Sequence, residues 1–441
     1  MRLLIYTEQT TERLTYTFDF ILGELLGLEY DLTNDSHAFL LYPGAKISYG
    51  RKPVEDELFF ESVSLLFETD ITIQPIDFVY HKNLTGFYPV SAQSVLPFDV
   101  FASTFVMISR YEEYLLHKKD KHNRYRSSQS MNYAAGFLSK PMINIYAVEL
   151  KKLLNSKFTG LKFKANKFEY IATFDVDTAY AYRGKGLKAN LRGGARAILM
   201  SNFGELADRY KVFFRNKKDP FDTFDYIIDT CRKYVIKTKI FFQVGNRSEF
   251  DTNTPHYYEP FQETIRNVAQ KSDLGIHLSY GSHGVPYAME EEIARLEEII
   301  GRKIVANRFH YLRFTMPASY ASLNAAGITE DYSFGYTTRV GFRAGTCTPF
   351  FLFNVLKNER TNIKIYPFAF MDTTLAQYNK LSAHESLEKI LQIMKSVKEV
   401  DGPFIGVWHN SSFIESGVWK GWKNVFETVA EEATALTEKS E

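Results

Sequence analysis

Apolar and polar positions follow two different patterns in the two parts of the chain. From about Lys167 onward, short apolar runs of strand length alternate with segments of helical period, which is the pattern of successive βα units. The predicted strands are Phe168–Phe174, Thr238–Val244, Asp273–His277, Lys303–Arg308, Asn362–Ala369 and Phe404–His409. The predicted helices are Phe221–Lys233, Pro260–Ala269, Tyr287–Gly301, Tyr320–Ala326, Ser386–Val400 and one from about Gly421. This alternation predicts the α/β class, as a barrel or an open doubly wound sheet.

The first part of the chain has a less regular pattern. Strand-like runs are predicted at Arg2–Tyr6, Ala38–Tyr42 and Ile71–Ile76, and helices at Leu14–Leu28 and Phe98–Leu116. A length of 441 residues is typical of two or three domains. We therefore predict a smaller α/β domain at residues 1–162, of unassigned role, followed by a larger domain at residues 167–441.

Composition excludes some classes of protein. The 53 Lys and Arg residues balance 52 Asp and Glu residues, so net charge gives no reason to expect a nucleic-acid partner. The two cysteines stand far apart, which predicts neither a disulfide framework nor a zinc–thiolate site. The N-terminus lacks the apolar core of a signal peptide, and no run approaches the roughly 18 apolar residues of a membrane span. We expect a cytoplasmic protein, and nothing in the sequence predicts its oligomeric state.

One segment departs from this balanced charge. Residues 183–219 contain ten Lys or Arg and three Asp or Glu, a local net charge of +7, and residues 197–206 within them are mostly apolar. A basic segment with an apolar stripe can lie on an anionic membrane or hold a phosphorylated substrate. A solvated loop with a short helix is the alternative.

Two carboxylates end the first strand of the larger domain. In an extended strand, residues i and i+2 point to the same face, so Asp175 and Asp177 should leave the strand side by side. When two carboxylates lie this near to each other, their repulsion favours a shared proton or a bound cation between them.

Polar clusters also follow other strands of this domain. They are Gly275–His283, Arg308–Phe314 and Val407–Ser412. In βα folds, active-site residues gather at the carboxyl ends of the strands, so we expect these clusters to converge. Carboxylate and imidazole ligands suit a divalent metal such as zinc. A second carboxylate could then accept a proton from water, and a separate histidine could protonate a leaving group.

The order and spacing of these clusters resemble the polysaccharide deacetylase (NodB-type) family of carbohydrate esterases. The resemblance covers about residues 167–441 and implies a distorted (β/α)7 barrel. The segment Thr173-Phe174-Asp175-Val176-Asp177 is similar to the family's first motif, Thr-Phe-Asp-Asp. The resemblance implies that Asp175 is the catalytic base and Asp177 a metal ligand, although Val176 is an insertion into that motif.

The later motifs imply the remaining site residues. His277 matches the first histidine of the second motif. Gly281 occupies the usual position of the second ligand, so His283 is the implied third ligand, with Ser282 as an alternative.

The third and last motifs imply two further catalytic residues. The arginine that orients the base in the third motif is matched by Arg313, with Arg308 as an alternative. The last motif is matched by Val407-Trp408-His409, which implies His409 as the general acid.

Other segments resemble less central parts of the family. Residues 326–336 and 341–346 resemble a segment expected to shape the substrate groove, and we assign Tyr280, Arg343 and Trp408 to substrate binding. Residues 1–162 resemble an α/β domain that precedes the barrel in a bacterial subgroup, through Ser109–Tyr114 and His122–Tyr125. The resemblance implies no activity for that domain.

The function implied is a metal-dependent deacetylase that hydrolyses N-acetyl or O-acetyl groups of a glycan or glycan precursor, with a carbohydrate or glycolipid as substrate. Because the second ligand is displaced, the alternative is a catalytically degenerate barrel that binds carbohydrate in surface-polysaccharide assembly. A glycosidase would need two carboxylates roughly 5–10 Å apart across a cleft. A pair on one strand face is better suited to chelation.

Overall fold

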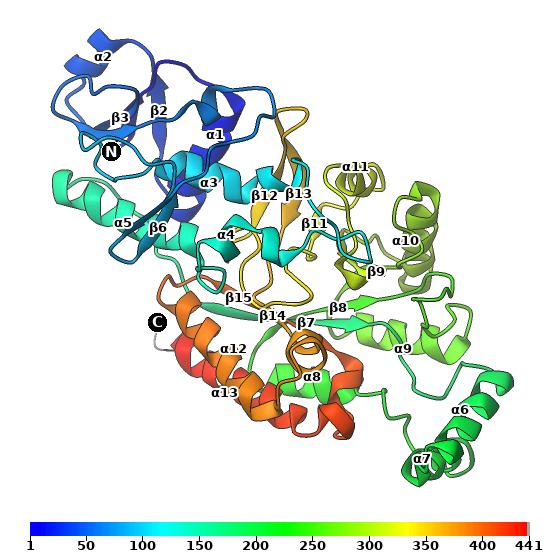
Figure 1. Ribbon diagram of the computed structural model, residues 1–441. Coiled ribbons are helices and arrows are strands. Elements are labelled where there is room, and N and C mark those ends of the chain that lie inside the picture. Colours follow the sequence, from blue (N-terminus) through cyan, green and yellow to red (C-terminus); the bar gives the residue numbers. More distant parts are fainter. Residues whose placement is uncertain (439–441) are drawn as a thin grey trace.

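The computed structural model describes residues 1–438 and contains a nine-stranded, a four-stranded and a two-stranded sheet (Figure 1). The large sheet has the order β12-β13-β11-β10-β9-β8-β7-β15-β14. Its strands are β7 (Glu169–Val176), β8 (Lys237–Phe242), β9 (Asp273–Leu278), β10 (Ala306–Phe309), β11 (Glu330–Asp331), β12 (Phe350–Asn354), β13 (Glu359–Ile365), β14 (Phe370–Met371) and β15 (Pro403–His409). The helices that alternate with them are α8 (Phe224–Lys233), α9 (Glu259–Ala269), α10 (Pro286–Ile300), α11 (Ala318–Ala325), α12 (Ala383–Lys398) and α13 (Trp422–Glu438).

The large sheet confirms an α/β fold, and its register determines what lies at its carboxyl edge. All of its pairs are parallel except the pair β12–β13. β7 and β15 pair so that Asp175 stands opposite His409, and β9 and β10 pair so that His277 stands opposite Arg308. Parallel pairing therefore brings the ends of the predicted polar clusters to one edge of the sheet.

One stretch of chain crosses from one side of the large sheet to the other. β13 lies beside β11, and the chain then continues through residues 366–369 into β14, which lies beside β15. Tyr366 N–H donates to the Asp331 carbonyl and Ala369 N–H donates to the Ile405 carbonyl, so the crossing itself is hydrogen-bonded. The strand ladder is interrupted between β13 and β14. Closure into a seven-stranded barrel therefore stays a prediction.

The N-terminal part forms a parallel sheet of order β2-β1-β3-β4 and a β5-β6 hairpin. Its strands are β1 (Leu3–Tyr6), β2 (Tyr30–Thr33), β3 (Lys46–Gly50), β4 (Leu58–Glu61), β5 (Phe78–His81) and β6 (Leu84–Phe87). Its helices are α1 (Glu12–Phe18), α2 (Ser36–Leu41), α3 (Val100–Ile108), α4 (Met131–Ala134) and α5 (Met142–Lys157).

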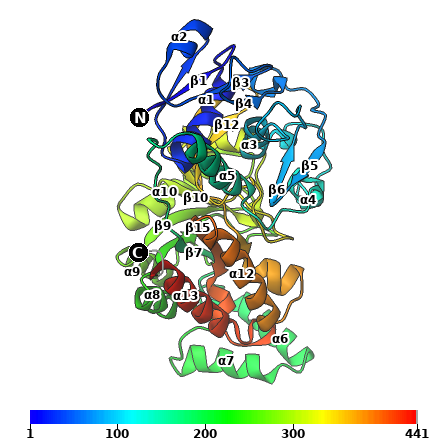
Figure 2. The same cartoon turned by 90° about the vertical axis from the view of Figure 1, so that its left-hand side faces the viewer.

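The N-terminal part packs on the antiparallel pair β12–β13, as Figures 1 and 2 show. The rings of Tyr16 in α1 and Phe105 in α3 lie 4.8 and 5.3 Å from the ring of Phe353 in β12. The Tyr16 hydroxyl also donates to the Phe351 carbonyl at 2.7 Å. One apolar core runs through both parts of the chain. The division at residues 162 and 167 remains a prediction.

Two predicted strands of the N-terminal part are wrong. Ala38–Tyr42 lies mostly in helix α2, because Asp35 caps this segment by accepting hydrogen bonds from the backbone N–H groups of His37 and Ala38. Ile71–Ile76 has no regular structure, and Ile73 is 86 % exposed. A short apolar alternation there has no neighbouring strand to pair with.

Residues 183–219 contain two helices, α6 (Leu187–Leu199) and α7 (Phe203–Phe214), instead of a loop with one short helix. Binding of this segment to a membrane or to a phosphorylated substrate stays a prediction. Both views place them at the end of the molecule opposite the N-terminal sheet (Figures 1 and 2). Among residues 1–438, no helix has the length and apolar character needed to cross a bilayer.

Candidate active site

A pocket of about 210 Å³ lies at the carboxyl edge of the large sheet. Its walls include Asp175, Asp177, His277, His310 and His409, which come from the ends of β7, β9, β10 and β15. Four of these five residues are predicted site residues. The structure therefore brings the ends of the polar clusters together around one cavity.

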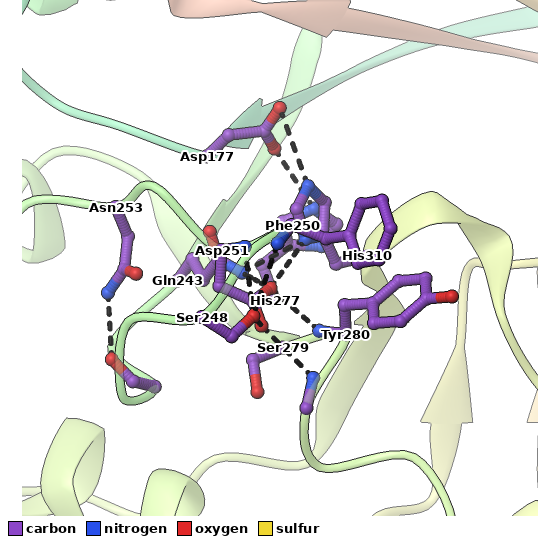
Figure 3. Close-up of polar contacts among 12 residues, drawn as sticks. Asp177, Gln243, Ser248, Phe250, Asp251, Asn253, His277, Ser279, Tyr280 and His310 are labelled. Atoms are coloured by element: carbon purple, nitrogen blue, oxygen red, sulfur yellow. Dashed lines mark hydrogen bonds and ion pairs between the residues drawn. The ribbon is translucent and has the colours of Figure 1, made fainter.

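Asp177, His277 and His310 form a group that could hold a metal ion. One ligand atom from each residue lies within 4.8 Å of the other two. His277 Nε2 lies 3.1 Å from Asp177 Oδ1, and His310 Nε2 lies 3.9 Å from Asp177 Oδ2 (Figure 3). Two imidazoles and one carboxylate are a common set of protein ligands for a divalent metal that keeps open positions.

The Nδ1 atoms of His277 and His310, which point away from Asp177, both form hydrogen bonds. His277 Nδ1 donates to the Arg308 carbonyl at 2.9 Å, and His310 Nδ1 donates to Asp251 Oδ1 at 2.9 Å. A proton on Nδ1 leaves the Nε2 lone pair of a neutral imidazole directed at Asp177. This outer-shell arrangement is the one that orients metal-ligating histidines.

Asp251 is itself held in place by several donors. Its carboxylate accepts hydrogen bonds from the backbone N–H groups of Tyr280 at 2.8 Å and Gly281 at 3.0 Å, and from Gln243 Nε2 at 2.7 Å (Figure 3). Burial raises the pKa of Asp251, but its hydrogen bonds with His310 and Ser248 lower the pKa by more. Asp251 is therefore an ionised partner that fixes the His310 ring.

Asp177 has the properties of an ionised ligand. Burial raises the pKa of its carboxyl group, but the neighbouring imidazoles of His310 and His409 lower it by more, so the net pKa lies well below the usual value. Within the described residues, the buried Oδ1 atom makes no hydrogen bond of good geometry. An ionised carboxylate close to the Nε2 atoms of His277 and His310 is a donor set that fits a divalent cation once both imidazoles are neutral.

Arg308 holds the second carboxylate of the pair. Its Nη1 donates to Asp175 Oδ1 at 2.8 Å, its Nη2 to Thr173 Oγ1 at 2.9 Å, and its Nε to the Tyr332 carbonyl at 2.9 Å. Arg308 is fully buried and Asp175 is 3 % exposed. A buried guanidinium with all these bonds fixes the orientation of the Asp175 carboxylate.

His409 is paired with a buried carboxylate on the opposite wall. His409 Nδ1 donates to Asp372 Oδ1 at 2.6 Å, while Asp372 Oδ2 accepts from the His409 backbone N–H at 2.7 Å and from Ser412 Oγ at 2.6 Å. Burial lowers the pKa of His409, but Asp372 and then Asp177 raise it by more, to about 10. The free Nε2 lies 3.9 Å from Asp177 Oδ2. His409 is therefore a protonated imidazole that faces the same cavity.

Arg313, the predicted partner of the base, does not contact Asp175. Its Nη1 donates to the Tyr280 carbonyl at 3.0 Å, and its guanidinium lies 4.1 Å from the centre of the Tyr280 ring. After β10 the backbone adopts left-handed conformations at Tyr311 and Leu312, with φ of 60° and 51°, which turn the chain away from the sheet. Arg308 lies in β10 itself, so its side chain reaches Asp175.

His283, the predicted third ligand, also lies outside the group of three. Its Nε2 lies 3.2 Å from Thr315 Oγ1. The alternative ligand Ser282 donates its hydroxyl to the Ser279 carbonyl at 2.9 Å. The loop after β9 closes as a tight turn on itself, and His310 from β10 stands where a third ligand is needed.

The predicted substrate-binding residues have different surroundings. Trp408 is fully buried and its Nε1 donates to the Tyr170 hydroxyl, because a residue next to His409 in a strand points to the opposite face. Arg343 is 3 % exposed and paired with Glu113. Tyr280 is half-buried, with its ring 4.4 Å from that of Phe250, which lines the pocket. None of the three lines the pocket, so their assignment to substrate binding stays a prediction.

Three residues of this site were not assigned from the sequence: His310, Asp251 and Asp372. His310 belongs to the polar cluster after β10, but the motif spacing favours His283 as the ligand. Asp372 ends the apolar run Phe368–Met371, so the rule of polar residues at strand ends could have identified it. Asp251 lies in a polar loop without periodicity and carries no comparable signal.

A family of unknown function (DUF7033) matches residues 3–159. No curated protein matches the chain.

Several solved structures are similar to the chain at low identity. One is assigned as a polysaccharide deacetylase from Mycobacterium smegmatis, with 12% identity over 63% of this chain and 92% of its own, and a TM-score of 0.39. Another is a family 4 carbohydrate esterase from Streptomyces lividans, with 10% identity over 63% of this chain and 90% of its own, and a TM-score of 0.30. A third is BA3943, a CE4 family pseudoenzyme from Bacillus anthracis, with 6% identity over 61% of this chain and 63% of its own, and a TM-score of 0.32.

Proposed function

We propose that this protein is a metal-dependent deacetylase that hydrolyses N-acetyl or O-acetyl groups of a glycan or glycan precursor. The observation that carries the proposal is the arrangement of three units around one pocket. These are the Asp177, His277 and His310 group, the Asp175–Arg308 pair, and the His409–Asp372 pair. The likeness of the Thr173–Asp177 and Val407–His409 segments to deacetylase motifs supports the same reaction.

Asp177, His277 and His310 would hold the cation, for which zinc suits the ligand set. When bound, a divalent cation supplies positive charge that polarises an acyl carbonyl and makes a water easier to deprotonate. His310 replaces His283 in this proposal, because its Nε2 faces Asp177 while its Nδ1 is anchored by Asp251.

Asp175 is the proposed general base. It would accept a proton from the water whose oxygen attacks the acetyl carbon, and Arg308 holds its carboxylate in position for that transfer. Arg308 therefore takes the role that the sequence pattern gave to Arg313. Its three hydrogen bonds come from a fully buried guanidinium, so little reorganisation accompanies the proton transfer.

His409 is the proposed general acid. When the bond between the acyl carbon and the sugar nitrogen breaks, His409 Nε2 would donate its proton to that nitrogen, and acetate and a free amine would be released. Asp372 keeps the other ring nitrogen, Nδ1, engaged and favours the protonated imidazole before the reaction.

The decisive experiment measures acetate release from N-acetylated oligosaccharides by the purified protein, with and without a chelator. The proposal expects release that stops with the chelator and returns when zinc is added. Asp175→Asn keeps the shape of the side chain and should abolish release while the protein still binds one metal ion. Metal binding without turnover on any acetylated glycan would favour the alternative, a barrel that only binds carbohydrate.

A further inference from the structure

The helical hairpin of α6 and α7 exposes an unusual concentration of large apolar side chains. The exposed residues, each at least 44 % accessible, are Leu187, Leu191, Ile198, Leu199, Met200, Phe203, Tyr210, Phe213 and Phe214. Nine such residues within 28 consecutive positions form a continuous feature, whereas single exposed apolar residues elsewhere need no explanation.

These side chains follow the helical period, so each helix has one apolar stripe. In α6, Leu187, Leu191 and Ile198 stand at spacings of four and seven, and Gly194 occupies the gap. In α7, Phe203, Tyr210 and Phe214 stand at spacings of seven and four. Residues at these spacings project from the same face of a helix. Both helices therefore present an apolar face to the surroundings.

The exposed faces do not result from a loose hairpin, because its inner faces are packed. Arg209 pairs with Glu205 at 2.7 Å, donates to Asn190 at 2.9 Å, and lies 4.5 Å from the centre of the Tyr182 ring. The Arg209 guanidinium lies directly over Gly193 of α6, so the two helices are in contact there. The hairpin has an interior of its own and a separate outer apolar surface.

The same two helices carry basic side chains without acidic partners on their other faces. Of the ten cations in residues 183–219, Lys217 pairs with Asp208, Lys218 with Asp225, and Arg209 with Glu205. Within residues 1–438 no carboxylate pairs with Lys188, Arg192, Arg196, Lys211 or Arg215, all of which are exposed. The outer surface of the hairpin thus combines aliphatic and aromatic groups with unneutralised positive charge.

The base of the hairpin is attached to the candidate active site. Asp219 accepts hydrogen bonds from the backbone N–H groups of Ala181, Tyr182 and Arg183 at 2.6–3.1 Å and so closes the insertion at its start and end. Asn410 Nδ2 donates to the carbonyls of Thr178 and Phe221 at 3.1 and 2.8 Å. Thr178 follows Asp177 and Asn410 follows His409 directly, so the hairpin leaves the molecule beside the pocket.

We propose that the α6–α7 hairpin binds the surface of an anionic lipid bilayer, with its apolar stripes inserted among the acyl chains and its lysines and arginines at the headgroups. A hairpin attached beside the pocket would then place the pocket close to the membrane. The class of substrate that fits this position is a lipid-linked acetylated glycan, a conclusion that rests on the proposed function.

Charge favours a lipid surface over a second copy of this chain. An amphipathic helix with Leu and Phe on one face and Lys and Arg on its polar face has the composition of helices that lie in the membrane interface. Anionic lipids attract each basic residue near the surface. Two copies of a segment with a net charge of +7 would repel each other across a shared apolar interface.

The proposal is tested by co-sedimentation of the full-length protein with vesicles of phosphatidylcholine alone and with vesicles containing phosphatidylglycerol. The wild type should bind the anionic vesicles, less strongly at high salt, and the neutral vesicles weakly. A variant with Arg192→Ser, Arg196→Ser, Lys211→Ser and Arg215→Ser should bind anionic vesicles at least about tenfold more weakly. A variant with Leu191→Ser, Ile198→Ser, Phe203→Ser and Phe214→Ser should lose binding to a similar extent.

The matched control carries Leu41→Ser and Ile73→Ser, two exposed apolar residues of the N-terminal part, and should bind as the wild type does. Wild-type protein that stays in solution with anionic vesicles would overturn the proposal, as would unchanged binding by either hairpin variant. A dimer that the Leu191, Ile198, Phe203 and Phe214 variant converts to a monomer, without any vesicle binding, would assign the surface to a second copy. Vesicle binding without acetate release would leave the docking surface standing and reject the proposed reaction.

Discussion

Arg308 contacts two parts of the candidate site through two different groups: its main-chain carbonyl accepts the Nδ1 proton of His277, and its guanidinium holds Asp175. The first contact orients a candidate metal ligand, and the second orients the proposed base. Because only the second depends on the side chain, substitution of Arg308 can separate the two roles.

Arg308→Lys should lower kcat by about 100-fold or more while metal affinity stays within a few-fold of the wild type. Lysine keeps the positive charge but cannot reproduce the forked hydrogen bonds to Asp175, Thr173 and the Tyr332 carbonyl. Acetate-release kinetics and metal titration of the same samples measure the two effects. Arg313→Lys is the control and should leave kcat nearly unchanged, and equal losses in both variants would contradict the assignment.

His310→Ala should weaken zinc binding far more than His283→Ala. His310 Nε2 faces Asp177, whereas His283 lies beside Thr315. Asp251→Asn should have an intermediate effect of about 10–100-fold, the usual range for a residue that orients a ligand. Competition with a chromophoric chelator gives the three affinities, and a larger loss in the His283 variant would restore the ligand set expected from the motif.

Asp372→Asn should reduce kcat by about 100-fold or more without reducing metal occupancy. Asparagine can still accept from the His409 backbone, but it removes the negative charge that favours the protonated imidazole. The pH dependence of kcat provides the second measurement, because its alkaline limb should move to lower pH in the variant. An unchanged limb would mean that His409 does not donate the proton.

Glu113 should make the free energy of unfolding fall at acidic pH. Burial raises the pKa of Glu113, but Arg343 and then Arg110 lower it by more, to about 2. A folded-state pKa below the unfolded value of about 4.3 gives stability that is complete above pH 4.3 and is lost as the pH falls towards 2. Urea unfolding across this range should show that loss in the wild type and less of it in Glu113→Gln.

At pH 7 the Glu113→Gln variant should be less stable by about 3–5 kcal/mol, because it leaves two buried guanidinium groups without their shared carboxylate. Glu359→Gln is the control. Glu359 forms an exposed ion pair with Lys357, so its substitution should change stability by less than about 1 kcal/mol. A Glu113 variant as stable as this control would show that the buried pair contributes little.

The sequence predicts the large sheet better than the N-terminal part for a physical reason. β7, β9 and β15 are long apolar runs buried on both faces, and each ends in a polar residue that reaches the pocket. The strands of the N-terminal sheet are four or five residues long, too short for periodicity to distinguish them from a helix such as α2. For α2, the helix-capping residue Asp35 is the local feature that indicates a helix.

The same limit applies inside the site. Asp175, Asp177, His277 and His409 could be found because they follow strands, whereas Asp372 follows a strand of only two residues. The choice between Arg308 and Arg313, and between His310 and His283, depends on two left-handed residues after β10 and on a turn after β9. These backbone conformations depend on packing against other segments, so the local sequence pattern does not predict them.

The apolar core shared by the two parts of the chain limits where the chain can be truncated. Tyr16 and Phe105 cover Phe353, so deletion of residues 1–162 would strip one face of β12 and β13 and leave apolar strands uncovered. β13 leads directly into β14 and Asp372, so the damage would reach the partner of the proposed general acid. We therefore expect residues 167–441 to fold poorly without the N-terminal part. Truncation of the chain at the junction should cause aggregation, because apolar strands would be exposed to solvent.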